Sequence, residues 1–270
     1  KLKVASPPLP EQQKIAKILS TWDRAISTTE RLIENSTQQK KALMQQLLTG
    51  KKRLLDESGK RFEGEWDEVK LSSLAKSGKG NFTDGDWIES PHITEDGCRL
   101  IQTGNIGVGY FKNKNKRYIS ETSFNELKCT EVKVGDLLIC RLAEPAGRAC
   151  VVPDIGEEKM LTSVDVAIMN VDKAKSSAKY LSYYFSLEHT LYLVSALCGG
   201  STRSRVSRTN LGTMKILLPD VIEQQKIATV LTNADKEIEL LEQQLADLQQ
   251  EKKALMQVLL TGKKRVKLND

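Results

Sequence analysis

The chain has 270 residues, of which 39% are hydrophobic and 28% are charged, and its formal net charge is +6 at pH 7. This length and composition are typical of a globular protein with a sizeable core. No run approaches the roughly 18 apolar residues needed to span a bilayer, and the first residues lack the apolar segment of a signal peptide, so we expect a cytoplasmic protein with no membrane partner.

The most informative feature is a long repeat, in which residues 11–53 recur without a gap as residues 223–265. Both copies begin with Glu-Gln-Gln-Lys-Ile-Ala and end with Leu-Leu-Thr-Gly-Lys-Lys-Arg. A separation this large excludes solenoids and propellers, whose units recur every 20–50 residues or so. We interpret the repeat as a duplicated module of a helix and a globular domain. The start at a lysine, inside the first motif, suggests a fragment of a longer protein or an incompletely recorded start.

Each copy of the repeat predicts one long helix. Apolar residues alternate at spacings of four and three, which is the heptad pattern of a coiled coil. Pro10 and Pro219 precede the two patterns, and Gly50 and Gly262 follow them, as expected at helix ends. The expected seam consists of Ile15, Leu19, Trp22, Ile26, Ile33, Leu43 and Leu47 in the first copy and Ile227, Leu231, Ile238, Leu241, Leu245, Leu248, Leu255 and Leu259 in the second.

The pairing of the two helices follows from their connections. Both join the same intervening segment, so pairing within the chain must be antiparallel. Pairing between two chains in a dimer is the alternative. The centre of the first copy is weaker, because Thr29, Ser36 and Lys40 occupy seam positions there.

Between the helices the pattern changes to short apolar segments separated by turn residues. We expect strands at 66–74, 100–103, 109–111, 135–140, 149–152 and 163–169, and a helix at 180–196. The predicted fold is therefore α+β, a mixed α/β globular domain flanked by two long helices that form an antiparallel coiled coil. The expected segments are a first helical repeat at 1–53, the globular domain at 54–218 and a second helical repeat at 219–270.

The sequence contains no known motif for catalysis or metal binding. The five cysteines have no paired spacing and predict buried, reduced thiols. Neither His92 nor His189 has a partner at ligand spacing. The glycines at 104–109 do not have the order of a dinucleotide-binding loop. We therefore expect no catalytic residue, no metal and no cofactor, and infer that any chemistry belongs to a partner.

Positive charge is concentrated at two places in an otherwise balanced domain, since residues 54–220 hold 22 Lys and Arg against 23 Asp and Glu. One is the run 112–117, and the other is 199–210, which contains three arginines and several hydroxyl residues. Arginine can contact guanine with two hydrogen bonds, and hydroxyl groups can bind phosphate oxygens. The alternative is a solvated loop whose arginines form local ion pairs.

Several of these strings together are similar to one protein family. The two Pro-containing Glu-Gln-Gln-Lys-Ile-Ala segments at 8–16 and 217–228, their Leu-Leu-Thr-Gly-Lys-Lys-Arg endings, and the segments 135–139 and 199–203 resemble the specificity subunit of type I restriction-modification enzymes. The resemblance covers nearly the whole chain. It departs from the family in having one target-recognition domain where the full subunit has two, so the chain resembles the second half of such a subunit or a half-subunit that forms a homodimer.

The resemblance implies a noncatalytic subunit that reads one half of a bipartite site in double-stranded DNA and docks methyltransferase subunits on its coiled-coil spacer. It also implies that S-adenosylmethionine binds the methyltransferase and that a restriction subunit joins through the complex. We expect base reading from Arg203, Arg205 and Arg208, with Gln102, Asn105, Lys79, Asn81 and Arg141 as weaker candidates. Phosphate contacts are expected from Ser201, Thr202, Lys112 and Lys114.

Two other functions are consistent with the residues alone. One is a coiled-coil adaptor whose middle domain binds protein and not DNA. The other is the recognition part of a single-chain methyltransferase or nuclease. A phosphate-binding surface must lose affinity for duplex DNA as salt rises, which separates DNA recognition from the adaptor.

Overall fold

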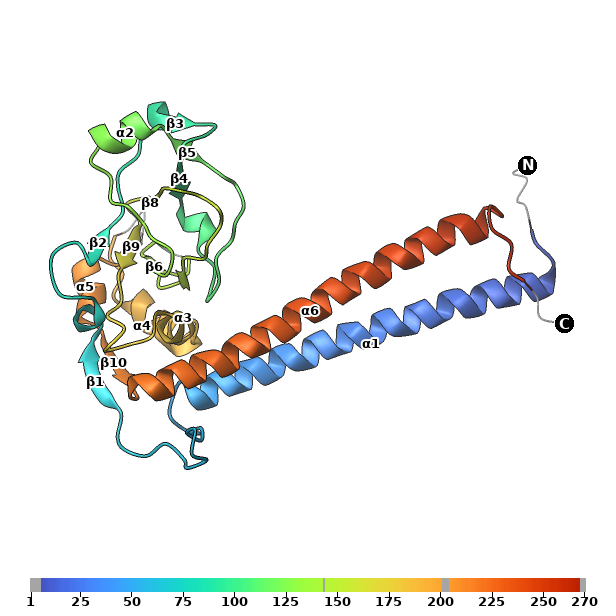
Figure 1. Ribbon diagram of the computed structural model, residues 1–270, viewed down its shortest axis with the longest axis horizontal. Helices are drawn as coiled ribbons and strands as arrows, with labels where there is room; N and C mark the ends of the chain where they lie inside the picture. The colour runs from blue at the N-terminus through green and yellow to red at the C-terminus, as the bar shows by residue number, and fades with distance from the viewer. Residues whose placement is uncertain (1–5, 143, 201–203, 268–270) are drawn as a thin grey trace. The chain divides into compact units, whose positions relative to one another are not determined.

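The structure is a computed structural model that describes residues 6–142, 144–200 and 204–267 (Figure 1). It divides into two compact units. The helical unit comprises the chain up to Leu43 and from Leu231 onwards, and the globular unit comprises Met44–Val230. The predicted fold class, a mixed α/β domain between two long helices, is confirmed.

The two repeats form the two long helices, α1 (Leu9–Leu47) and α6 (Val221–Leu260). Their 39 and 40 residues correspond to lengths of about 58 and 60 Å at roughly 1.5 Å per residue. Gly50 and Gly262 follow the helix ends with φ of +71° and +70°, a conformation that glycine adopts without strain. The stop signals therefore lie where they were predicted, and Pro219 precedes α6, whereas Pro10 lies in the first turn of α1.

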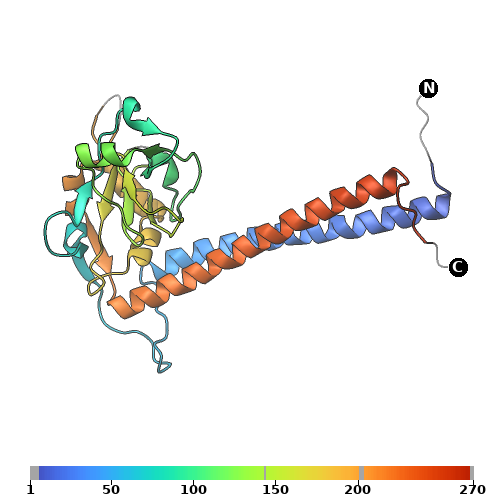
Figure 2. The same cartoon turned by 45° about the horizontal axis from the view of Figure 1, so that its top comes forward.

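Within the helical unit, α1 and α6 lie side by side and antiparallel (Figures 1 and 2). Lys40 pairs with Asp235 near one end of the unit, and Lys252 pairs with Asp23 further along. Between them, the Ser36 hydroxyl donates to Glu237 at 3.2 Å. The pairing in the structure is therefore the expected antiparallel pairing within one chain.

The predicted seam is the buried stripe of both helices. Every seam residue named above is buried or half-buried. Thr29, a polar residue on the weak part of the seam, is only 4% exposed, and its hydroxyl donates to the Ala25 carbonyl one turn earlier at 3.0 Å. A hydroxyl satisfied in this way can be buried without the cost of an unpaired polar group.

The described residues of the globular unit form three small sheets. β1 (Asp67–Lys70) pairs with β10 (Lys215–Leu218) in an antiparallel ladder. A four-stranded sheet has the order β2 (Phe82–Asp84), β9 (Val166–Met169), β6 (Leu137–Cys140) and β7 (Ala149–Val151), and all its neighbours are antiparallel. The third has the order β3 (Ile93–Thr94), β5 (Tyr118–Ile119), β4 (Cys98–Ile101) and β8 (Met160–Thr162), with β4 and β8 parallel.

The core lies around the two central strands of the β2–β9–β6–β7 sheet. All four residues of β6 and all four of β9 are buried. Such strands have continuous apolar runs because side chains on both faces pack against protein. Leu138 and Ile168 are direct partners across the ladder and belong to the same hydrophobic cluster. Four short α-helices complete the part of the unit that the structure describes: α2 (Glu121–Glu126), α3 (Ala178–Tyr184), α4 (Glu188–Ala196) and α5 (Arg208–Thr213).

Several predicted elements differ in the structure. The strand expected at 66–74 ends at Lys70, and Leu71–Leu74 is a 3₁₀ turn, which places Leu71 and Leu74 on one buried face. Residues 109–111 form no strand, because the chain turns at Gly109 with φ of +86°. The short strands β2, β3, β5, β8 and β10 had not been predicted.

The helix expected at 180–196 is two helices, α3 and α4, separated at residues 185–187. Phe185 and Val194 are both fully buried. Nine residues are two and a half turns, so one straight helix would have placed these side chains on opposite faces. The break between α3 and α4 allows both to be buried.

Candidate nucleic-acid interface

The arginine-rich segment after α4 is closed at its base by backbone hydrogen bonds. The Gly199 amide donates to the Arg205 carbonyl at 3.1 Å, and the Arg205 amide donates back at 3.0 Å. The predicted DNA-binding residues Ser201, Thr202 and Arg203 lie outside the described residues. The side chain of Ser207 then caps α5 by accepting from the Asn210 amide at 3.0 Å.

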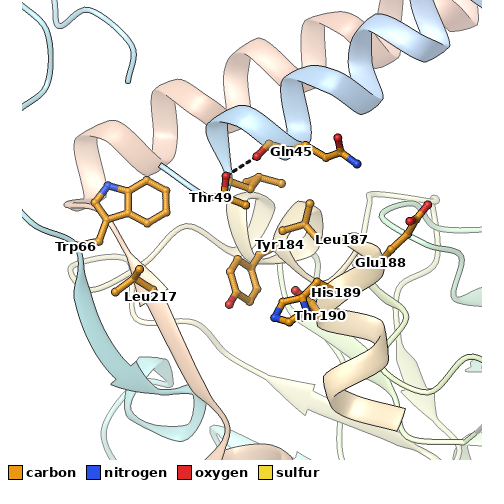
Figure 3. A pocket seen from close by; sticks show the side chains of 10 residues that line it. Gln45, Thr49, Trp66, Tyr184, Leu187, Glu188, His189, Thr190 and Leu217 are labelled. Atoms are coloured by element: carbon orange, nitrogen blue, oxygen red, sulfur yellow. Dashed lines mark hydrogen bonds between the residues drawn. The ribbon is translucent and has the colours of Figure 1, made fainter. Parts of the chain in front are cut away.

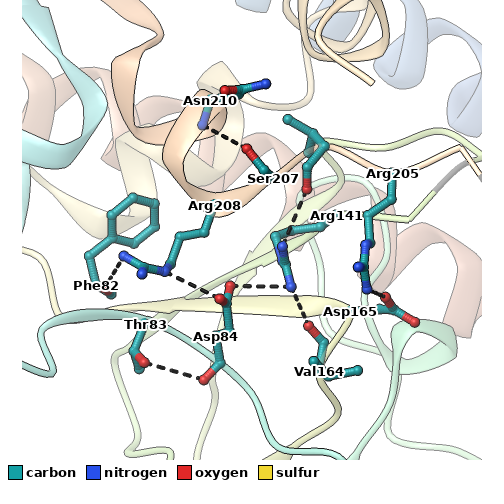
Figure 4. Close-up of polar contacts among 11 residues, drawn as sticks. Phe82, Thr83, Asp84, Arg141, Val164, Asp165, Arg205, Ser207, Arg208 and Asn210 are labelled. Carbon is teal, nitrogen blue, oxygen red and sulfur yellow. Dashed lines mark hydrogen bonds and ion pairs between the residues drawn. The ribbon is translucent and has the colours of Figure 1, made fainter. Parts of the chain in front are cut away.

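Arg141 lies beneath this segment and is only 5% exposed (Figure 4). Its Nη2 donates to the Val164 carbonyl at 2.6 Å, and its Nη1 is 3.4 Å from the Val206 carbonyl. The Arg141 carbonyl accepts from the Val206 amide at 3.0 Å. The expected base-reading role of Arg141 is not consistent with this position, because its guanidinium is buried and bound to protein groups.

Asp84, the last residue of β2, is the carboxylate shared by two arginines (Figure 4). Its Oδ1 is 3.2 Å from Arg141 Nη2, and its Oδ2 accepts from Arg208 Nε at 3.3 Å. Arg208 also donates through Nη1 to the Phe82 carbonyl at 3.0 Å, and its guanidinium lies 5.8 Å from the Phe82 ring centre. Burial lowers the pKa of Arg141, and the charge of Asp84 opposes that shift.

Arg205 and Arg208 are the predicted arginines that the structure leaves accessible. Their side chains are 46% and 39% exposed. Arg205 Nη1 donates to Asp165 Oδ1 at 3.0 Å (Figure 4). The arrangement combines the two interpretations of this segment, because Arg205 and Arg208 both form local ion pairs and both have partly exposed side chains.

The amide side chains predicted to read bases are held by the chain itself. Asn105 is 2% exposed, and its amide donates to the carbonyls of Lys112 and Lys114 at 2.9 and 2.7 Å. Its own side-chain oxygen accepts from the backbone amide of Gln102 at 2.9 Å. The side chain of Asn81 donates to the Ser77 carbonyl at 2.9 Å. The buried Asn105 organises the loop that carries Lys112 and Lys114, which corrects its expected base-reading role.

The remaining lysines have different surroundings. Lys79 and Lys114 are exposed, whereas Lys112 is half-buried and lies 5.5 Å from the ring centre of Tyr110. Lys112 and Lys114 have no contact with the Arg205–Arg208 segment among the described interactions. Their role as phosphate contacts stays a prediction.

The sequence reasoning missed Asp84 and Asp165, the two counter-ions of the arginine segment. Asp84 precedes a glycine, and Asp-Gly in a single sequence reads as a turn. Ion pairs between residues 124 and 40 positions apart leave no local pattern.

The described residues contain no group of three or more His, Cys, Asp or Glu side chains that could hold a metal ion. The five cysteines are free, although Cys129 and Cys198 are half-buried where full burial was expected. Burial raises the pKa of Cys150 to about 12 and that of Cys129 to about 11, so neither thiol is activated as a nucleophile. No helix in the described part is long and apolar enough to cross a membrane.

The C-terminal residues of α1, which belong to the globular unit, pack among apolar side chains. Leu47 and Leu48 are each 1% exposed. Beside them is a cavity of about 380 Å³, and Figure 3 shows the side chains that surround it. Its lining consists of Gln45, Leu48, Thr49, Trp66, Tyr184, Leu187, Glu188, His189, Thr190 and Leu217.

Arg53, which follows α1, links the C-terminal end of α1 to the start of α6. Its Nε and Nη2 donate to the two carboxylate oxygens of Glu223 at 2.7 and 2.6 Å, and Glu223 is fully buried. A buried carboxylate needs such a bidentate partner to offset the loss of hydration.

The chain is similar to known proteins in sequence and in fold. Residues 1–36 and 63–250 match the family described as "Type I restriction modification DNA specificity domain". In Methanocaldococcus jannaschii, the type I restriction enzyme MjaVIII specificity subunit is 29% identical over 274 residues, and the putative MjaX specificity subunit is 31% identical over 271. Each match covers 98% of this chain, and the chain spans 63% and 60% of the two relatives.

Solved structures have the same fold. The HsdS subunit of Thermoanaerobacter tengcongensis matches 95% of this chain with a TM-score of 0.58 and 18% identity, and 59% of that subunit is covered. The S subunit of the type I system of M. genitalium matches 97% with a TM-score of 0.58 and 13% identity, and 62% of it is covered. The repeats, the fold and the family match agree, and the chain belongs to the family of type I restriction-modification DNA specificity domains.

Proposed function

We propose that this chain is the noncatalytic DNA-recognition subunit of a type I restriction-modification system, and that its globular unit reads one half of a bipartite site. The observation that carries this proposal is the arginine segment. Arg205 and Arg208 have partly exposed side chains on a backbone that is closed at Gly199–Arg205 and supported from below by Arg141. Guanidinium groups held in this way suit guanine edges and phosphates.

The bipartite site is supported by two equivalent leucines with different surroundings. Leu48 and Leu260 occupy the same position in the two repeats, yet Leu48 is 1% exposed and Leu260 is 57% exposed. In the globular unit, Trp66, Tyr184 and Leu217 line the same cavity as Leu48. We propose that a second recognition domain, in the same polypeptide or in a second copy of the chain, covers Leu260 in the same way.

The helical unit is the proposed spacer and docking surface for methyltransferase subunits. Besides its buried seam, it presents Leu32 and Leu240, which are 47% and 71% exposed. Both side chains are accessible to a partner subunit, which would bury them in a contiguous interface. S-adenosylmethionine then binds the methyltransferase subunit, and a restriction subunit joins through the assembled complex.

The test is to map methylated sites in cells that carry this protein with its cognate methyltransferase. We expect a split recognition sequence for the wild type and loss of one half-site, or of all modification, for Leu260→Lys. Gln249→Lys adds the same charge at an exposed position of α6 and serves as the matched control. A wild-type complex that modifies no specific sequence would contradict DNA recognition. A Leu260→Lys complex with an unaltered split site would contradict the proposal that a second recognition domain covers Leu260.

The salt dependence of duplex binding separates this function from a protein-binding adaptor. A phosphate-binding surface releases counterions, so its affinity for duplex DNA must fall as salt rises. Duplex binding that is absent at low salt would favour the adaptor.

A further inference from the structure

The guanidinium of Arg141 joins three segments that are distant in the sequence. It contacts Asp84 at the end of β2, Val164 before β9 and Val206 in the arginine segment. The backbone of Arg141 is fixed as well, because its amide donates to the Asp165 carbonyl at 2.8 Å and its carbonyl accepts from Val206. Arg141 thus connects the β2 edge of the β2–β9–β6–β7 sheet to the segment that carries Arg205 and Arg208.

The carboxylate of Asp84 reduces the repulsion among the positive charges of Arg141, Arg205 and Arg208. Arg205 and Arg208 both act electrostatically on Arg141, and their charges disfavour its charged form. The Asp84 carboxylate lies between Arg141 and Arg208 and contacts both, at 3.2 and 3.3 Å. Like charges held close together in a partly buried site repel strongly unless an opposite charge separates them.

The conformation of Arg208 depends on the same carboxylate. Arg208 is the first residue of α5, and its Nε and Nη1 are bound to Asp84 and to the Phe82 carbonyl (Figure 4). Its guanidinium carbon lies 5.8 Å from the centre of the Phe82 ring, and the side chain is 39% exposed. A side chain fixed on one side and open on the other can contact a base with little loss of conformational entropy.

We infer that Asp84 and Arg141 are positioning residues that determine the DNA specificity of the segment 204–208, a role that presupposes the half-site reading proposed above. Neither residue need touch DNA. Arg141 fixes the backbone of Val206, and Asp84 fixes the side chain of Arg208 and offsets one positive charge. The fixed arginines favour contacts with a specific sequence. Fewer arginine side chains are then free to bind any phosphate.

Asp84→Asn separates positioning from simple support of the fold. Asparagine has nearly the same size, but it removes the charge that holds Arg208. We expect the ratio of cognate to scrambled duplex affinity to fall about 10-fold or more. The affinity for scrambled duplex should stay the same or increase, because one uncompensated positive charge is gained. The slope of log affinity against log salt should steepen by about 0.9 if the released arginine contacts one phosphate.

The experiment uses the full chain assembled with its methyltransferase subunit, and a cognate duplex taken from the methylation map of the wild type. Binding of cognate and scrambled duplexes is measured across a salt series, and the melting temperature is recorded for each variant. Glu68→Gln is the matched control, because it makes the same charge change on β1, where Glu68 accepts from Lys215 at 2.6 Å. The control should keep the wild-type affinity ratio.

The outcomes are distinct. A wild type that does not prefer its mapped site contradicts the proposed function itself. A wild type that discriminates, with an Asp84→Asn variant that keeps the same ratio, overturns the positioning role. If Asp84→Asn lowers the melting temperature and both affinities together, Arg208→Gln decides. It removes the same ion pair from the arginine side, and an unaltered ratio there also overturns the role.

Discussion

Arg265 donates two hydrogen bonds to the carboxylate of Glu11, from Nε to Oε1 at 2.8 Å and from Nη2 to Oε2 at 2.6 Å. The repeat makes this pair equivalent to Arg53 and Glu223, whose bonds measure 2.7 and 2.6 Å. The ion pair of Lys40 with Asp235 and that of Lys252 with Asp23 are equivalent in the same way. These two kinds of ion pair are therefore symmetric, and each is made once by each copy of the repeat.

We expect Glu11→Gln to lower the melting temperature of the helical unit, because glutamine cannot offer two charged acceptors to Arg265. Circular dichroism at 222 nm during heating measures the effect. Glu34→Gln removes a charge from an exposed position of α1 and should have a smaller effect. Equal melting temperatures for Glu11→Gln and the wild type would contradict a stabilising role for the pair.

The same pair predicts a pH dependence. The side-chain hydrogen bond from Arg265 holds the pKa of Glu11 below its ordinary value of 4.5. A carboxyl group whose pKa is lower in the folded state stabilises the fold fully above the unfolded pKa, and this stabilisation is lost as pH falls through the folded pKa. The difference in melting temperature between wild type and Glu11→Gln should thus be constant above pH 4.5 and shrink below it. A difference that grows on acidification would contradict the assignment.

Leu48 and Leu260 give a matched pair of stability predictions. Leu48→Ala removes a buried side chain next to a cavity and should cost about 2–5 kcal/mol of unfolding free energy. Leu260→Ala acts on the same residue in the second repeat, where it is exposed, and should change stability by about 0.5 kcal/mol or less. Urea denaturation of the full chain measures both. Similar costs for the two variants would show that Leu260 is already covered.

The sequence predicted the helices far better than the arginine cluster, for a physical reason. A heptad seam repeats the same local signal over many residues, so Leu231 or Leu245 is placed by its neighbours as well as by itself. Strands of two to four residues such as β3 and β5 carry no comparable signal, and their pairing is decided by distant partners.

The candidate site shows the same limit. The sequence identified the segment that contains Arg205 and Arg208, because its composition is local. It could not show that Arg141 is buried beneath that segment or that Asn105 is bound to carbonyls of its own loop. Both assignments depend on which residues the fold brings together, and an exposed and a buried arginine are written with the same letter.

Arg205 gives the most direct test of base reading. We expect Arg205→Ala to weaken binding of the cognate duplex by roughly 1–3 kcal/mol if its guanidinium contacts a guanine, with a smaller effect on scrambled duplex. The loss should be concentrated at one base pair of the half-site, which a panel of single-base substitutions reveals. Arg61→Ala, at an exposed position of the globular unit, is the control. A uniform loss across all sequences would indicate a phosphate contact instead.

The length of the helical unit should set the spacing between the two half-sites. Ile26–Leu32 and Ile238–Gln244 are equivalent heptads of the two repeats, and duplicating both keeps the 3.5-residue seam of each helix in register. Seven residues add about 10.5 Å, which is about 3 base pairs at about 3.4 Å each. Methylation mapping should therefore show the same two half-sites with a gap longer by about 3 base pairs. Duplication in α1 alone leaves one heptad without a partner and should abolish modification. An unchanged gap in the double duplication would show that the helices do not determine the spacing.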